Sequence, residues 1–311
     1  MNTRLTHILK AVAESSRSSG PDSGRIAFGN GRFAIRVAGD LESRKKAYRL
    51  VYQLYREKGY ARHDLSGMWV SIHDAAPETA TLLVERLSDG AAVGAITVVF
   101  DSPLGLPADN AYAGELNPLR AAGRRLAEVV SLGVTEGVDA GREILVKLFD
   151  YAHLLSREIR GATDFVITVN PRHVRFYEKT LLCEKAGPER AYGKVGGAPA
   201  VLLRLALSTS DWARAGGKSS EGTVSPKPRT LYPLAHPESE EPAILASLRR
   251  DIRPLHTEEF IRLFLEETDV WTKADPGQRA HLRARYAGWR RTETDARTPE
   301  GIPPVTTREI R

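Results

Sequence analysis

The sequence predicts an α/β protein with one mixed, mostly antiparallel sheet flanked by helices, followed by a small C-terminal helical extension. Three observations predict this class. Strand-like apolar runs occur throughout residues 25–207, and three stretches with helical periodicity interrupt them. Two tight turns join consecutive strand candidates, which favours antiparallel pairing. A polar stretch then separates this part from residues 238–290, where apolar residues recur at helical spacing.

The N-terminal elements begin with a predicted turn at Gly29-Asn30-Gly31 that joins two short strands within residues 25–38. The same letters match the nucleotide fingerprint G-x-G-x-x-A, but a strand-like alternation follows where that fingerprint requires a helix. We therefore expect no nucleotide there. Asp40 is a suitable N-cap for a helix over residues 41–58, which ends at Gly59.

Strands are predicted next, with a hairpin turn at Ser88-Asp89-Gly90, over residues 68–72, 81–87 and 91–100. Residues 101–123 are an insertion rich in Pro and Gly with one short helix, and loops of this length are usually functional or disordered. The remaining elements of the sheet are predicted to be a strand at 125–134, a helix at 140–159, a strand at 164–169, a helix at 171–182 and a strand at 198–207.

The domain organisation follows from composition. We predict a flexible or docking segment at 1–24, a folded domain at 25–208, a linker at 209–230, a helical extension at 231–291 and a disordered tail at 292–311. The first segment has no continuous apolar region typical of a secretory signal. Its apolar residues form one helical stripe, which favours a short docking helix over a weak membrane-surface contact. No apolar run approaches the ~20 residues that span a bilayer.

Charge and cysteine content limit the partners and the compartment. The net charge of +6 and the pI near 9.4 favour anionic partners, among them nucleic acid, anionic lipid and an acidic carrier protein. A single cysteine, Cys183, excludes an intrachain disulfide and agrees with a reducing cytoplasm. Its apolar neighbours indicate a small buried side chain. Neither a metal-binding spacing nor a G-x-S-x-G elbow is present.

Glu128 lies in the middle of an apolar strand, where a charged residue is rarely buried without a partner. One interpretation is an ion pair with Arg124, Arg125 or a neighbouring strand. The other is a general base whose pKa is raised by its apolar surroundings. The residues alone do not favour either.

Three segments together resemble one family: residues 101–134, AYRLVYQLYREKGY at 47–60 and VNPRHVRFYEKTLL at 169–182. They are similar to the long-chain N-acyl amino acid synthases of the FeeM type, relatives of the acyl-homoserine lactone synthases with a GNAT-like acyltransferase fold. The resemblance covers residues 33–207, and residues 230–290 resemble a helical extension of some members. It implies transfer of a long acyl group from acyl carrier protein to the α-amine of an amino acid. The donor would be an acyl-phosphopantetheine on that carrier, with no bound cofactor and no metal.

Two features of the residues agree with a carrier-bound donor. The start of the helix near residue 140 reads TEGVDAGREIL, without the basic residue and paired glycines that hold a coenzyme A pyrophosphate. Acyl carrier proteins are acidic, and this chain is basic. The candidates for a docking face are Arg120, Arg124, Arg125, Arg142, Lys147, Arg172 and Arg175.

The resemblance also implies roles for individual residues. Glu128 would deprotonate the acceptor's ammonium, directly or through water, and Tyr177 would protonate the departing thiolate. Arg49 would pair with the acceptor's carboxylate. Backbone N–H groups would stabilise the oxyanion, and the substrate-binding candidates are Arg49, Ser131, Leu132, Gly133, Val134 and Asn170. The family tends to have basic residues at the places of Ser131 and Val51.

Two alternatives remain. One is a coenzyme A-dependent GNAT N-acetyltransferase. The other is a catalytically inactive GNAT-like module that binds a protein or nucleic acid through RAHLRARYAGWRR at 279–291, where aromatic residues stand among arginines. No nucleic-acid-binding module is recognisable, so a solvated helix face is preferred and nucleic acid is not expected as a partner.

Overall fold

The computed structural model describes residues 25–214 and 230–286. The predicted N-terminal segment 1–24, most of the predicted linker, residues 287–291 of the predicted extension and the predicted tail 292–311 lie outside the described residues.

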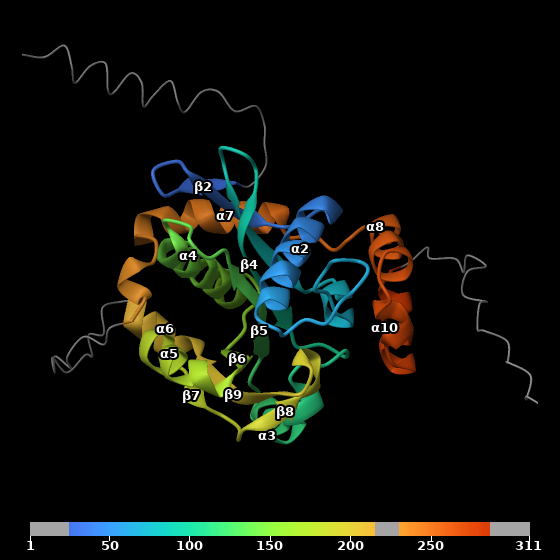
Figure 1. Ribbon diagram of the computed structural model, residues 1–311. Coiled ribbons are helices and arrows are strands. Elements are labelled where there is room, and N and C mark those ends of the chain that lie inside the picture. The colour runs from blue at the N-terminus through green and yellow to red at the C-terminus, as the bar shows by residue number, and fades with distance from the viewer. Residues whose placement is uncertain (1–24, 215–229, 287–311) are drawn as a thin grey trace, which may run out of the picture.

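Nine strands form one sheet in this part of the chain, in the order β1-β2-β3-β4-β5-β6-β9-β7, with β8 paired to β9 (Figure 1). Neighbours are antiparallel except β5 and β6, which are parallel. The predicted mixed, mostly antiparallel sheet is therefore confirmed. The strands are β1 (Ile26–Phe28), β2 (Phe33–Val37), β3 (Ala80–Arg86), β4 (Ala92–Phe100), β5 (Leu126–Val134), β6 (Asp164–Val169), β7 (Glu184–Lys185), β8 (Arg190–Tyr192) and β9 (Ala198–Ala206).

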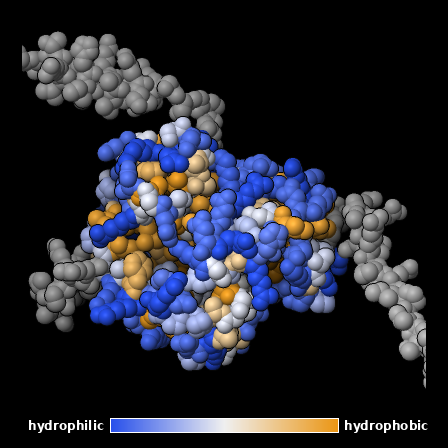
Figure 2. Space-filling model, in the orientation of Figure 1, coloured by the Kyte–Doolittle hydropathy of each residue, from blue (hydrophilic) through white to orange (hydrophobic). Residues whose placement is uncertain are grey.

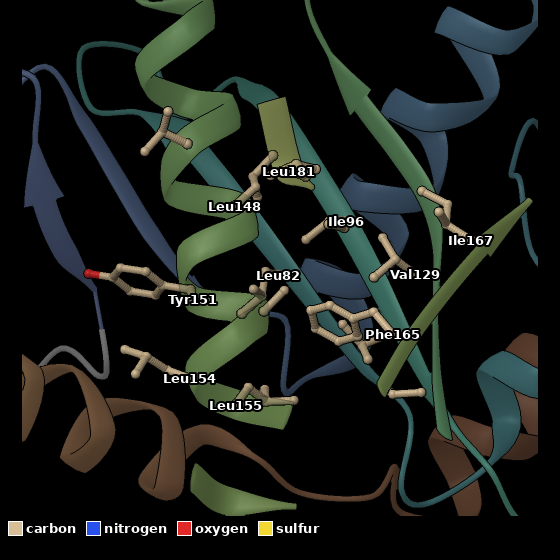
Figure 3. Close-up of a cluster of buried hydrophobic side chains, with 14 of the residues drawn as sticks. Leu82, Ile96, Val129, Leu148, Tyr151, Leu154, Leu155, Phe165, Ile167 and Leu181 are labelled. Atoms are coloured by element: carbon tan, nitrogen blue, oxygen red, sulfur yellow. The ribbon is translucent and has the colours of Figure 1, made fainter. Parts of the chain in front are cut away.

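Helices cover both faces of the sheet. On one face α2 (Leu41–Glu57) packs on β3 and β4, and α3 (Asp109–Ala121) packs on β4, β5 and β6. On the other face lie α4 (Gly141–Leu154), α5 (Pro171–Leu181) and α7 (Glu241–Asp251). Figure 3 shows the α4 side, where Leu148 of α4 and Leu155 just after it belong to the same buried cluster as Leu82 and Ile96 of the sheet. This layer is the main hydrophobic core.

The short helices complete the chain. They are α6 (Leu207–Arg214), α8 (Thr257–Ile261), α9 (Val270–Lys273) and α10 (Pro276–Arg285), with single turns or π-helical segments at Ile72–Ala75, Leu155–Ile159, Gly193–Val195, Tyr232–Leu234, Glu238–Glu240 and Arg262–Glu266. None of the described helices is long and apolar enough to cross a bilayer.

The strand predicted at residues 68–72 is wrong. Met68 is buried beside Tyr48 of α2, and the N–H of Trp69 donates to the Tyr48 carbonyl at 3.0 Å. The segment therefore uses its apolar side chains and backbone to cover α2, and a 3₁₀ turn follows at Ile72–Ala75. Strands β7 and β8 were not predicted, because two- and three-residue strands give no detectable alternation.

The predicted boundaries near residue 208 also differ from the structure. Helix α6 occupies the first part of the predicted linker, and the Oγ of Ser210 lies 3.0 Å from Nδ1 of His153 in α4. Ile244 and Leu248 of α7 belong to the main core. The extension is thus packed into the domain rather than attached to its surface.

Candidate active site

The parallel strands β5 and β6 separate partway along their length. Their pairs run from Leu126↔Asp164 to Glu128↔Val166, although β5 continues to Val134 and β6 to Val169. A cavity of about 890 Å³ occupies the opening. Residues 129–135 and 167–170 line it.

The cavity runs through the sheet. On the α2 side Leu54, Tyr55 and Trp69 line it, and on the α4–α5 side Leu145 and Tyr177 do so. Figure 2 shows hydrophobic residues gathered in the hollow between α4 and the pair α5 and α6. Two molecules can therefore meet in this opening from opposite faces of the sheet.

A β-bulge shapes one wall of the cavity. Val130 pairs with Thr97 and Gly133 pairs with Ala95, so Ser131 and Leu132 together face a single residue of β4. Ser131 has φ 53°, a left-handed conformation that is uncommon for a residue other than glycine. The carbonyl of Leu132 accepts a hydrogen bond from the Tyr55 hydroxyl at 3.4 Å. The bulge residues Ser131 and Leu132 and the two residues that follow them all line the cavity.

Glu128 is fully buried at the last position of β5 that pairs with β6, and it is not among the residues that line the described cavity. Its Oε2 accepts the backbone N–H of Ala108 at 2.7 Å. Burial, followed by the charge of Glu128, raises the pKa of Tyr192, which places this tyrosine near the carboxylate. Tyr192 also lines the cavity. Arg124, a partner considered for Glu128, instead pairs with Asp164 at 2.5 Å.

Tyr177 projects from α5 into the cavity, and its ring lies edge-on to Phe149 of α4. Burial, followed by the charges of Tyr55 and Cys183, raises its pKa, so the hydroxyl keeps its proton at neutral pH. Burial and then the charge of Glu178 raise the pKa of Cys183 to about 12. The Cys183 thiol therefore stays protonated, and only the thiolate is a good nucleophile.

Asn170 ends β6 and begins α5. Its side chain accepts a hydrogen bond from the backbone N–H of Arg172 at 3.2 Å. Pro171 occupies the first helical position, where proline is favoured because a backbone N–H at that position would have no partner within the helix. Asn170 lines the cavity, as do Ser131, Leu132, Gly133 and Val134, the other backbone positions predicted to bind substrate.

The arginines predicted to form one docking face are divided between two ends of the sheet. Arg142 lines the cavity, Arg172 lies 5.7 Å from the ring of the cavity residue Tyr60, and Arg175 is exposed on α5. Arg124 and Arg125 instead precede β5, at the end of the strand opposite the cavity. Two of the predicted cations are held by intramolecular ion pairs: Arg124 with Asp164 and Arg120 with Asp101 and Asp109.

Arg49 is exposed on α2 and is not among the residues that line the described cavity. This placement does not support its predicted contact with the acceptor's carboxylate. Lys58 and Arg142 are cations that do line the cavity. Val51, at a place where the family tends to have arginine, is 1% exposed and packs beside Gly133.

Sequence reasoning did not identify Tyr55, Trp69 and Tyr192 as cavity residues. The rings of Tyr55 and Trp69 pack edge-on, with centroids 5.0 Å apart. Tyr55 lies within a segment that supported the family resemblance, so its place there was an available signal. Tyr192 gave none, because β8 is too short to be recognised.

The basic segment at 279–291 makes intramolecular contacts in its described part. Arg283 lies 5.4 Å from the Trp271 ring, Arg285 pairs with Glu78, and the Tyr286 hydroxyl donates to the Ala75 carbonyl at 2.7 Å. These contacts account for the aromatic and arginine pattern through packing. Residues 287–291 lie outside the described part of the chain. Among residues 25–214 and 230–286, no group of His, Cys, Asp and Glu side chains is arranged to hold a metal ion.

Comparisons with known proteins agree with this geometry. Residues 46–206, more than half of the chain, match the family described as N-acyl amino acid synthase FeeM. The structure of FeeM, an N-acyl amino acid synthase from uncultured soil microbes, is similar with a TM-score of 0.50 and 28% identity, covering 58% of this chain and 93% of FeeM. No curated protein matches the chain.

Two acyl-homoserine lactone synthase structures are similar to a lesser degree. The acyl-homoserine lactone synthase LasI has a TM-score of 0.42 and 16% identity, covering 56% of this chain and 90% of its own. The coenzyme A-dependent acyl-homoserine lactone synthase BjaI, solved with SAM and isopentyl-CoA, has a TM-score of 0.39 and 15% identity, covering 56% of this chain and 82% of its own.

Proposed function

The chain belongs to the N-acyl amino acid synthase FeeM family, and from this membership we propose that it transfers a long acyl chain from acyl carrier protein to the α-amine of an amino acid. The family and the fold make the chain an N-acyltransferase. The identity of the donor and of the acceptor is the proposal, and we place the reaction in the cytoplasm, where the carrier would supply its acyl groups.

The observation that carries the proposal is the cavity through the sheet between β5 and β6. A thioester entering from the α4–α5 side meets an amine entering from the α2 side at the point where the strands separate. Holding two reactants in such contact removes much of the entropic part of the barrier.

The loop before α4 favours a carrier-bound donor over coenzyme A. Glu136 and Gly137 of this loop line the cavity, and the Glu136 carboxylate pairs with Lys58 at 3.3 Å. A pyrophosphate at this helix start would meet the Glu136 carboxylate, and like charges repel. The single phosphate of phosphopantetheine carries less negative charge than a pyrophosphate and is therefore repelled less. Positive charge near the cavity for an acidic carrier comes from Arg142, Arg172 and Arg175.

The chemistry is a direct aminolysis. Glu128, acting through water or Tyr192, takes a proton from the acceptor's ammonium, and the free amine attacks the thioester carbonyl carbon. Backbone N–H groups of residues 132–134, directed by the bulge, stabilise the oxyanion. The C–N bond forms and the C–S bond breaks. The second proton of the attacking nitrogen passes to the leaving thiolate through Tyr177, which gives up its own proton and regains one, and Glu128 returns the first proton to solvent. The products are an amide and the free thiol of the carrier, without net oxidation or reduction.

The test is a reconstituted reaction of the full chain with a long-chain acyl donor and a mixture of amino acids. Mass spectrometry should find N-acyl amino acids with the donor on acyl carrier protein, together with an equal amount of carrier bearing a free thiol. Product from acetyl- or acyl-coenzyme A alone would make the enzyme a coenzyme A-dependent GNAT. No product from either donor would overturn the proposed function.

A further inference from the structure

A second, smaller cavity of about 40 Å³ lies on the α4 side of the sheet, between α4, α5 and α6. Val129, Ile167, Tyr177 and Leu231 line both this cavity and the large one. The small cavity therefore adjoins the large one, on the side of the sheet proposed for the thioester. Part of its wall comes from α6 and from residues 231–235, which follow the family-matched residues 46–206.

Most side chains that line this small cavity are apolar, among them Val146, Phe149, Phe165, Leu181 and Leu205. The polar groups in its lining are paired with protein groups. Asp150 forms an ion pair with Arg214 and a hydrogen bond with Nδ1 of His236, and Ser210 contacts His153. A hydrocarbon tail fits the apolar lining, and the paired polar groups do not attract it, because separating a buried ion pair is costly.

The turn at residues 231–235 is fixed at both ends. The Leu231 N–H donates to the Thr180 carbonyl at 3.0 Å, and the Tyr232 hydroxyl donates to the Leu181 carbonyl at 2.7 Å, so one end is tied to α5. At the other end the His236 N–H donates to Asp150 of α4 at 3.0 Å. A wall held in this way limits the space instead of adapting to its occupant.

We propose that this turn closes the acyl compartment and sets the longest acyl chain that the enzyme uses. The occupant is the saturated tail of the donor's acyl group, and the inference rests on the proposed function. Leu231 and Ala235 are the specificity-determining residues, since both face the small cavity. The extension after residue 206 thus takes part in substrate selection.

Two substitutions with opposite expected effects test this inference. Leu231→Ala removes part of the wall but keeps the backbone bonds of the turn, and Ala235→Leu fills the end of the cavity. Leu234→Ala is the matched control, because Leu234 lies in the same turn but is 49% exposed and does not line the cavity. Across donors of graded chain length, the optimum of kcat/KM should move about two carbons longer for Leu231→Ala and about two carbons shorter for Ala235→Leu. The control should keep the wild-type optimum.

The outcomes separate this inference from the proposed function. If the wild type forms no N-acyl amino acid, the proposed function fails, and calorimetry with saturated fatty acids of graded length still reports whether Leu231→Ala and Ala235→Leu move the preferred length. If the wild type is active but both variants keep its chain-length optimum, the turn does not set acyl length. Thermal melting checks each fold. Should Leu231→Ala unfold, Ala235→Leu decides the question, because this variant keeps the buried Leu231 side chain.

Discussion

The backbone N–H of Ala108 donates to the buried carboxylate of Glu128 at 2.7 Å, which ties the insertion before α3 to the centre of the sheet. In this hydrogen bond Oε2 of Glu128 is the acceptor, so the bond gives the carboxylate a structural partner. The carboxylate therefore combines an anchoring contact with the position proposed for the general base.

Glu128→Gln separates these two roles. The amide oxygen of Gln can still accept the Ala108 N–H, so we expect the melting temperature to stay close to that of the wild type. Because the amide cannot accept the ammonium proton, we expect kcat to fall by about 10²-fold or more. The measurement is steady-state turnover alongside a thermal melt.

The matched control is Glu85→Gln. Glu85 is also a buried strand glutamate, but it lies on β3 in ion pairs with Arg36 and Lys46. Its substitution should lower the melting temperature and leave kcat unchanged. Full turnover in Glu128→Gln would remove Glu128 from the base role.

Tyr177→Phe tests the proton donor. Phe keeps the edge-on contact with Phe149, so the fold should persist. A thiolate is already a fairly stable anion, so the loss in kcat should be smaller than for the base, about tenfold. Tyr151→Phe, at a buried tyrosine of α4 outside the cavity lining, should have no effect on kcat. Equal turnover in the two variants would contradict the proposed role of Tyr177.

Charge reversal tests carrier docking. Arg142→Glu and Arg172→Glu change cations near the cavity, so the KM for the acyl carrier protein donor should rise about tenfold at low salt and less at high salt, because salt screens surface charges. Arg125→Glu is the control, because this exposed arginine lies at the opposite end of β5. If all three variants raise KM equally, the docking face does not surround the cavity.

The central strands and the three long helices follow from local patterns in the sequence. Short apolar runs identify β3 to β6, and the apolar stripe and the Asp40 cap identify α2. These signals are local because the pattern that identifies each element lies within its own consecutive residues. The same reasoning fails at residues 68–72, where an apolar run covers a helix instead of joining the sheet.

The site itself depends on contacts between distant segments. The bulge at Ser131 is a property of the register between β4 and β5. The hydrogen bond from Ala108 to Glu128 joins residues that are 20 positions apart in the sequence, on either side of α3. The exposure of Arg49 depends on which side of α2 faces the sheet, and both sides carry apolar residues in the sequence. The residue pattern was therefore sufficient to indicate Glu128 as a candidate, and the family resemblance indicated Tyr177, but neither could place Arg49 or Arg124.

Glu259 links the C-terminal extension to the start of α2 and should make stability depend on pH. Its carboxylate accepts the backbone N–H of Leu41 at 3.1 Å and two hydrogen bonds from Arg253, at 2.8 and 3.0 Å. Burial alone would raise the pKa of Glu259, but the bonds from Arg253, His256 and Leu41 outweigh it and lower the pKa from 4.5 to about 2.

A carboxyl group whose pKa is lower in the folded state stabilises the fold above its unfolded pKa and loses that contribution as the pH falls. The contribution of Glu259, at most on the order of 3 kcal/mol, should therefore be complete above about pH 5 and disappear between about pH 4.5 and pH 2. Glu259→Gln should lower the melting temperature by several degrees at pH 7, with the difference from the wild type shrinking toward pH 2. Glu258→Gln, at the exposed neighbour, should melt like the wild type at every pH. A Glu259→Gln variant that melts with the wild type at pH 7 would show that this link does not hold the extension to α2.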